Sequence, residues 1–144
     1  MSYYCAATDL QRTRSDIVDA GVDSLDDYID DAEAQINDRL DTAWYRGAAR
    51  ERGIDYVETR FDPDLVTVTS QIKAVAVYLT LALVYESVSR SDDETDPFAQ
   101  LGRRYRNLYM VEIEALLQAG IDYDYEDDDD PEHDTAMPRV LKRM

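Results

Sequence analysis

The fold is decided by the stretch DPDLVTVTSQIKAVAVYLTLALVYESVSR, residues Asp62–Arg90, which is the most apolar part of a strongly acidic chain. Its first residues, Asp62 and Pro63, are typical of a helix start, because Asp caps unpaired backbone N–H groups and Pro has no N–H to leave unpaired. Between Ala74 and Tyr85, apolar side chains would occupy nearly every face of such a helix. The stretch therefore predicts a central buried helix that needs partners on several sides.

Two amphipathic helices are predicted to supply those partners. The first, Ser24–Arg46, begins with Ser24 and Asp27 in the spacing of a capping box, and either Gly47 or Gly53 offers an end. The second, Pro97–Ala119, repeats the Asp-Pro start and is followed by a glycine. Both carry apolar residues at three- and four-residue steps, so each is expected to pack one face on the central helix.

The remaining segments predict shorter elements around this bundle. We expect an all-α fold with a small bundle of three long helices, short N-terminal helical turns, and an irregular loop or short β-arm at about 54–62. Residues 121–144 combine a dense acidic run with two prolines and a basic-apolar end, and such a segment cannot bury enough apolar surface to order alone. The predicted organisation is thus a helical domain, 1–120, and an extended tail, 121–144.

Composition sets the class of protein. The formal charge of −17 comes from 32 acidic and 15 basic residues, and the only lysines are Lys73 and Lys142. Such a charge opposes compaction by self-repulsion, which salt screens. The Asp-rich, Lys-poor composition resembles proteins of salt-loving archaea and their viruses, and an ordinary acidic cytosolic protein is the alternative. A general nucleic-acid binder is not expected, because no basic stripe is present to neutralise phosphates.

Targeting segments are not predicted. The apolar run Ala74–Tyr85 is shorter than the roughly 18–20 residues that cross a bilayer. The N-terminus lacks the basic start and apolar core of a signal peptide, and the single cysteine, Cys5, cannot form an internal disulfide. We expect assembly inside a cell, without a membrane.

Catalytic and metal-binding patterns are not recognisable in the sequence. The single histidine, His133, excludes a zinc site built on several histidines. Phosphate-binding glycine loops and a nucleophile elbow do not occur. Acidic residues from Asp122 alternate as in a calcium loop, but Asp127 and His133 stand where that loop requires Gly and Glu. We therefore expect no enzyme, no cofactor and no metal site.

Two further patterns have open interpretations. The pairs Asp26/Asp30 and Asp27/Asp31 have helical i,i+4 spacing, which suits either a bound cation or, preferably, a solvated acidic face. The chain has 11 tyrosines, a residue type enriched at subunit interfaces because one end can be buried while the other stays wet. Packing at the edge of the core is the alternative. The candidate interface residues are Tyr45, Tyr56, Tyr105 and Tyr109.

Four segments together resemble a known family. They are Tyr3-Tyr4-Cys5 followed by Thr8-Asp9-Leu10, the run Ile29-Asp30-Asp31-Ala32-Glu33-Ala34-Gln35-Ile36-Asn37, Asp62-Pro63-Asp64-Leu65-Val66, and Tyr105-Arg106-Asn107-Leu108-Tyr109. From about Tyr3 to Ile121 the chain resembles the head–tail connector (adaptor) proteins of tailed phages. It departs from that family in its acidic surface, in the insert Ala48–Arg60 and in the acidic tail.

The resemblance implies a structural virion protein, here of a virus of halophilic archaea. Such a protein would form a ring, commonly a dodecamer, under the portal, join the DNA-filled head to the tail, and let DNA pass without specific binding. It would be assembled in the host cytoplasm, with the portal protein and a tail-side adaptor or tail-completion protein as partners. By the same analogy the C-terminal arm, Arg139, Val140, Leu141, Lys142 and Arg143, would dock on the portal. The alternative function is an acidic helical partner-binding protein, regulatory or DNA-mimicking, of a halophilic cell.

Overall fold

The computed structural model describes residues 4–17, 24–89 and 95–125, and the backbone of 132–134. The elements are α1 (Ala7–Thr13), α2 (Leu25–Leu40), a π-helical segment (Asp41–Tyr45), α3 (Arg46–Glu51), α4 (Lys73–Val88), α5 (Pro97–Ala119), β1 (Ile121–Tyr123) and β2 (Glu132–Asp134). The predicted all-α class, with a bundle of long helices, is confirmed. None of the helices in these described ranges is long and apolar enough to cross a membrane.

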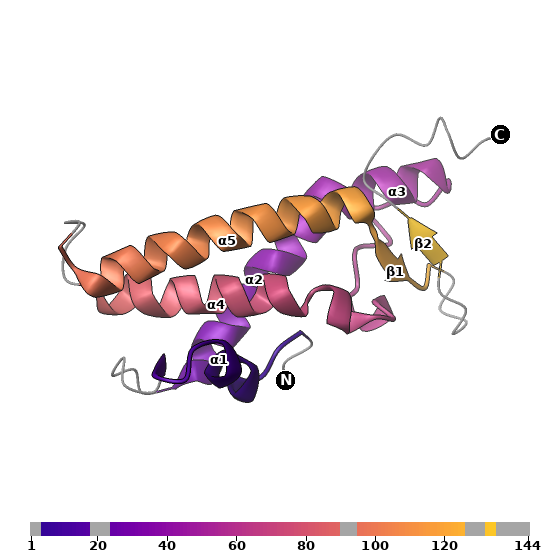
Figure 1. The fold of residues 1–144 in the computed structure, drawn as a ribbon. Helices are drawn as coiled ribbons and strands as arrows, with labels where there is room; N and C mark the ends of the chain where they lie inside the picture. Colours follow the sequence, from indigo (N-terminus) through magenta and orange to yellow (C-terminus); the bar gives the residue numbers. More distant parts are fainter. Residues whose placement is uncertain (1–3, 18–23, 90–94, 126–131, 135–144) are drawn as a thin grey trace.

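Helix α4 is the centre of the bundle (Figure 1). Helix α5 runs beside it in the opposite direction, α2 crosses behind both, and α1 lies against α4 and α2. The side chains of Val77 and Leu81 are only 5% and 0% exposed, on faces of α4 that sequence alone could not assign to a partner. Elements of the same chain therefore cover these positions, and no neighbouring subunit is needed to bury them.

The predicted start of the central helix at Pro63 is wrong. Asp62 does act as a cap, but its carboxylate accepts a hydrogen bond from the N–H of Asp64 in a single 3-10 turn. Helix α4 begins ten residues later, at Lys73. The β-branched residues Val66, Thr67 and Val68 favour extended backbone, and Val66 forms an antiparallel bridge with Tyr123. A second 3-10 turn, Thr69–Gln71, then comes before α4. A strand-like partner distant in sequence thus outweighs a local helix signal.

Helix α2 differs from prediction at both ends. The chain does become helical after Ser24. The Ser24 side chain makes no capping hydrogen bond, however, so the predicted capping box with Asp27 is not formed. At the other end the helix passes through Gly47 and continues by way of the π-helical segment into α3. The turn comes at Gly53, whose φ of 74° is the left-handed conformation that glycine adopts without strain. Ala48 and Ala49 are buried, which favours continuing the helix.

The bounds of α5 agree with prediction. The Asp96 carboxylate accepts hydrogen bonds from the N–H groups of Phe98 and Ala99, and Pro97 occupies the first helical position. Gly120, with φ of 85°, ends the helix. Both signals act over a few residues, which is why the sequence was sufficient here.

The loop at 54–62 and the segment after α5 also bear on the predicted fold. Residues 54–62 form turns, so the irregular-loop prediction is correct for them and the β-arm alternative is not. The one strand pair in the described ranges follows α5, with Ile121 opposite Asp134 in antiparallel register. Ile121 and Tyr123 are each 1% exposed. The core therefore extends past the domain boundary predicted at residue 120.

The N-terminal helical turn is observed as α1, with Leu10 fully buried. The backbone N–H of Ala6 donates to the Asp9 carboxylate, which fixes the start of the helix. Residues 18–23, between α1 and α2, lie outside the described residues.

Candidate functional site

The N-terminal segment contacts α2 through hydrogen bonds of Tyr4. The backbone N–H of Tyr4 donates to the Glu33 carboxylate at 2.8 Å, and the Tyr4 hydroxyl donates to Asn37. Glu33 is only 5% exposed, although carboxylates are rarely buried without partners. Because Glu33 and Asn37 are four residues apart, they lie on one face of α2. This pair of contacts holds the N-terminal segment against the bundle.

Cys5 lies in the same region and is buried. Burial raises the pKa of its thiol to about 11, and the Glu33 and Asp9 carboxylates act in the same direction, while a hydrogen bond with Thr80 and the Lys73 charge oppose the shift. A thiol with this pKa is protonated at neutral pH, and the thiolate is the reactive form. The environment of Cys5 therefore suits a packing role and not a nucleophile.

An aromatic cluster closes the opposite end of the bundle. Its members are Trp44, Tyr45, Phe61, Tyr123 and Tyr125. The rings of Trp44 and Tyr123 have centroids 5.6 Å apart in an edge-to-face arrangement, a favourable geometry for aromatic pairs. The guanidinium of Arg52 lies 4.1 Å from the ring centre of Tyr125. The cluster packs residues 121–125 against the π-helical segment that follows α2.

Hydrogen bonds reinforce this cluster. The Tyr123 hydroxyl accepts from the N–H of Asp62 at 3.0 Å, and the Tyr45 hydroxyl donates to the carbonyl of Thr59. Burial is the main reason that the pKa of both phenols is raised. The loop before α4, the π-helical segment after α2 and the segment after α5 are thereby packed together.

Three of the four predicted interface tyrosines belong to the core. Tyr45, Tyr105 and Tyr109 are 1%, 6% and 7% exposed within their own chain. Tyr105 stacks between Tyr78 and Tyr85, at centroid distances of 6.2 and 6.0 Å. Because they are buried within their own chain, these side chains are not available to a neighbouring subunit. The sequence could not show this, since buried and interfacial tyrosines follow the same helical spacing. The alternative of packing in the core fits them.

Tyr56 is different, because it lies half-buried in the loop after α3. The guanidinium groups of Arg46 and Arg50 lie 5.5 and 5.7 Å from its ring centre. Neighbouring Val57 is 65% exposed. A role for Tyr56 at a subunit interface stays a prediction.

Ion pairs connect α5 to its neighbours. Arg106 donates two hydrogen bonds to the Glu86 carboxylate of α4, at 3.0 and 2.7 Å, and Arg39 of α2 donates to Glu114 of α5 at 2.9 Å. All four side chains are partly exposed, so each pair contributes little to stability. The pairs do fix how the three helices sit against one another.

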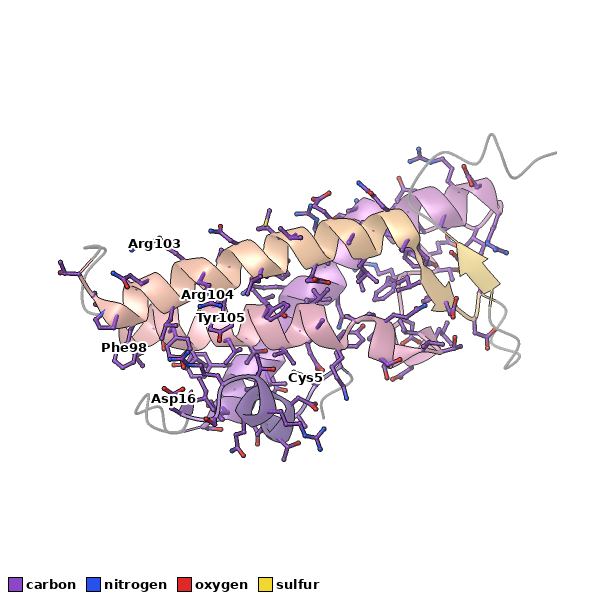
Figure 2. All side chains as sticks on the ribbon, viewed as in Figure 1. Cys5, Asp16, Phe98, Arg103, Arg104 and Tyr105 are labelled. Carbon is purple, nitrogen blue, oxygen red and sulfur yellow. The ribbon has the colours of Figure 1, made fainter. Side chains whose placement is uncertain are left out.

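The outer faces of α2 and α5 carry opposite chemistry. On α2 the exposed residues include Asp26, Asp27, Asp30, Asp31 and Asp38, with Ala34 and Gln35 between them. On α5 they include Arg103, Arg104, Asn107, Met110, Val111, Glu114, Ala115 and Gln118, and Glu114 is the one that pairs with Arg39 of α2. Figure 2 shows Arg103 on the outer side of α5. The sequence predicted the acidic face of α2 and the arginines on the outer side of α5, but not the exposed Met110 and Val111 beside those arginines.

Groups that could bind a metal ion or a small molecule were sought among the described residues. These residues contain no group of three or more His, Cys, Asp or Glu side chains placed to hold a metal ion. The pairs Asp26/Asp30 and Asp27/Asp31 are exposed, which favours the solvated acidic face. An open hollow of about 400 Å³ between α1 and α4 contains Lys73, whose Nζ lies 3.6 Å from the Asp9 carboxylate. That carboxylate offsets the positive charge there.

The predicted portal-docking arm, Arg139–Arg143, lies outside the described residues, as does the side chain of His133.

Comparison with protein-family models, with curated proteins and with solved structures finds no match. The residues that sequence reasoning missed are chiefly Glu33 and the partners of Tyr123. The alternation of Ile121, Tyr123 and Tyr125 was the available signal, since it is typical of a strand with one buried face.

Proposed function

We propose that this chain is a head–tail connector, or adaptor, of a tailed virus of halophilic archaea. The observation that carries the proposal is that the segments resembling the family are also the segments that join the helices. Tyr4 contacts Glu33 and Asn37, Val66 pairs with Tyr123, and Arg106 pairs with Glu86. The resemblance thus involves residues that define the shape of the subunit, as expected for a structural protein.

The physical properties of the chain fit this role. A ring subunit needs a rigid body, and here α4 is buried by three other helices of the same chain. A channel protein must also let DNA slide, and a formal charge of −17 repels phosphates instead of binding them. The proposal requires no catalytic group. Its partners are other copies in a ring, proposed to be a dodecamer, with the portal protein on one side and a tail-side adaptor or tail-completion protein on the other.

The test is the mass of the full chain in molar KCl, measured by sedimentation alone and after mixing with the portal protein encoded in the same genome. We expect a closed ring, formed alone or on the portal. Removing residues 139–144 should weaken portal binding, and it leaves the packed segment Ile121–Tyr125 intact. The matched control replaces Arg139, Lys142 and Arg143 with Gln, which removes charge but keeps length. Failure of the full chain to bind portal in any salt would overturn the proposal.

One observation favours a second candidate. The five exposed aspartates of α2 lie on one side of the helix, which is what an acidic partner-binding or DNA-mimicking protein would present. The same mass measurement separates the two functions. A stable monomer or dimer that binds a basic DNA-binding protein, and competes with DNA for it, would favour this second candidate over the adaptor.

A further inference from the structure

The outer face of α5 combines exposed cations with exposed apolar side chains, and it also carries the exposed Glu114. Met110 and Val111 are 43% and 66% exposed, so two large apolar side chains that face solvent are adjacent on one helix. Arg103 and Arg104 lie two helical turns before them and are also exposed. An apolar centre beside cations is typical of an interaction surface for an acidic partner.

The outer face of α2 matches that surface in spacing. Arg104 and Val111 are seven residues apart on α5, and Asp27 and Ala34 are seven residues apart on α2. Seven residues correspond to about 10 Å along a helix axis. A helix face carrying carboxylates and a small side chain at this distance can therefore meet cations and an apolar side chain on the other helix together.

We propose that the outer face of α5 docks on the outer face of α2 in a second copy of this chain. In this contact Arg103 and Arg104 meet the aspartates of α2, and Met110 and Val111 pack over Ala34, whose small side chain lets the helices approach. The proposal rests on the proposed function only in that both require self-association. The contact between α5 and α2 does not depend on the chain being a viral protein.

The position of the two faces determines the kind of assembly. Helices α2 and α5 pack on different parts of α4, with α2 crossing behind the pair formed by α4 and α5 (Figure 1). Within one chain α2 reaches α5 through the Arg39–Glu114 ion pair, and in the proposed contact the other outer residues of the two helices meet in different copies. Each copy offers one face of each kind, so the contact is head-to-tail, and repeated contacts of this type generate a ring when the rotation closes.

Salt should affect the two parts of the contact differently. At molar salt the Debye length is about 3 Å, so the charge pairs lose most of their long-range attraction. Burial of Met110 and Val111 persists in high salt and is strengthened by salting-out anions. The apolar centre is thus the part that a halophilic environment preserves, while the charges select the partner face.

The test compares the association of full-length variants by sedimentation over a concentration series, at about 0.15 M and at molar KCl. One variant carries Arg103→Glu with Arg104→Glu, a second carries Asp27→Arg with Asp31→Arg, and a third combines all four changes. The matched control, Arg12→Glu with Arg60→Glu, makes the same charge change at exposed side chains outside both faces. Circular dichroism checks that each variant is folded.

We expect the first two variants to weaken association at the lower salt by at least tenfold, while the four-residue variant and the control associate like the wild type. At molar KCl, Val111→Asp should weaken association by at least tenfold, because it places a charge in the apolar centre. Unchanged association of the first two variants and of Val111→Asp would overturn this inference but leave the adaptor proposal standing. A wild type that remains monomeric alone overturns this inference, and one that also fails to bind portal overturns both.

Discussion

Helices α2 and α5 have the same inward role and different outward ones. Each packs an apolar stripe on α4, with Ile36 of α2 and Ile113 of α5 both fully buried. Outside, α2 presents aspartates, whereas α5 presents arginines beside exposed Met110 and Val111. The fold constrains the inward faces and leaves the outward faces almost unconstrained. Their composition therefore carries information about solvent and partners, which is where a function without catalytic groups has to be sought.

The largest effect is expected where both helices meet, on α4. Leu81→Asp places a charge at a fully buried position, and we expect it to abolish cooperative unfolding, a loss above about 4 kcal/mol. Thermal unfolding followed by circular dichroism measures this. Ala74→Asp makes the same change at an exposed site of α4 and should remain folded. A folded, monomeric Leu81→Asp variant would mean that this face of α4 belongs to a subunit interface.

Truncating the inward faces should give the next largest effect. Ile36→Ala and Ile113→Ala should each cost about 2–5 kcal/mol, because each removes buried methyl groups and leaves a cavity. Urea denaturation of the two variants gives the values. On the outward face, Met110→Ala should stay within about 0.5 kcal/mol of the wild type when measured on the monomer. Equal losses at Ile113 and Met110 would contradict the division of α5 into inner and outer faces.

The dependence of stability on pH tests how dry the interior under the two helices is. Burial raises the pKa of Cys5, beneath α2, and of Tyr109, on the inner side of α5. A raised pKa in the folded state means that the unfolded state loses its proton first as the pH rises. The stabilisation is therefore complete below about pH 9 and is lost as pH rises, for Cys5 between 9.0 and about 11, and for Tyr109 from 10.0 upward.

Urea midpoints between pH 8 and pH 11 measure this loss for the wild type and for Cys5→Ala. Removing the thiol should remove a decline on the order of 2 kcal/mol from the pH profile. The part caused by tyrosines remains and can be followed separately by tyrosinate absorbance. Identical profiles for the wild type and Cys5→Ala would show that the thiol is accessible to water.

The smallest effect is expected on the outward face of α2. Asp30→Asn with Asp31→Asn removes like-charge repulsion with Asp26 and Asp27, and should stabilise the monomer by about 0.2–0.5 kcal/mol per pair at low salt. At molar KCl the gain should disappear because the charges are screened. Thermal midpoints over a KCl series test this, and a gain that persists in molar salt would contradict an electrostatic cause.

Features that depend on residues close together in the chain could be predicted from the sequence, whereas features that depend on contacts between distant residues could not. The bounds of α5 depend on Asp96, Pro97 and Gly120, which act locally, and they were correct. The start of α4 was wrong because Val66 pairs with Tyr123, far along the chain, and local patterns do not contain that contact. Three tyrosines predicted at an interface lie in the core of the structure. The sequence could not distinguish these two positions, because buried and interfacial aromatic residues share one helical spacing. The acidic face of α2 was predictable, since exposed charges need no distant partner.

The most direct test of the contact between copies is a disulfide placed across it. In a Cys5→Ala background, a chain with Ala34→Cys is mixed with a chain carrying Val111→Cys, oxidised mildly, and examined by non-reducing electrophoresis. The control pair combines Val57→Cys, at another exposed valine, with Val111→Cys. If α5 docks on α2 of a neighbouring copy, the 34–111 pair gives a cross-linked heterodimer in clear excess over the control. Equal and low cross-linking in both pairs, under conditions in which the chains associate, would contradict the account.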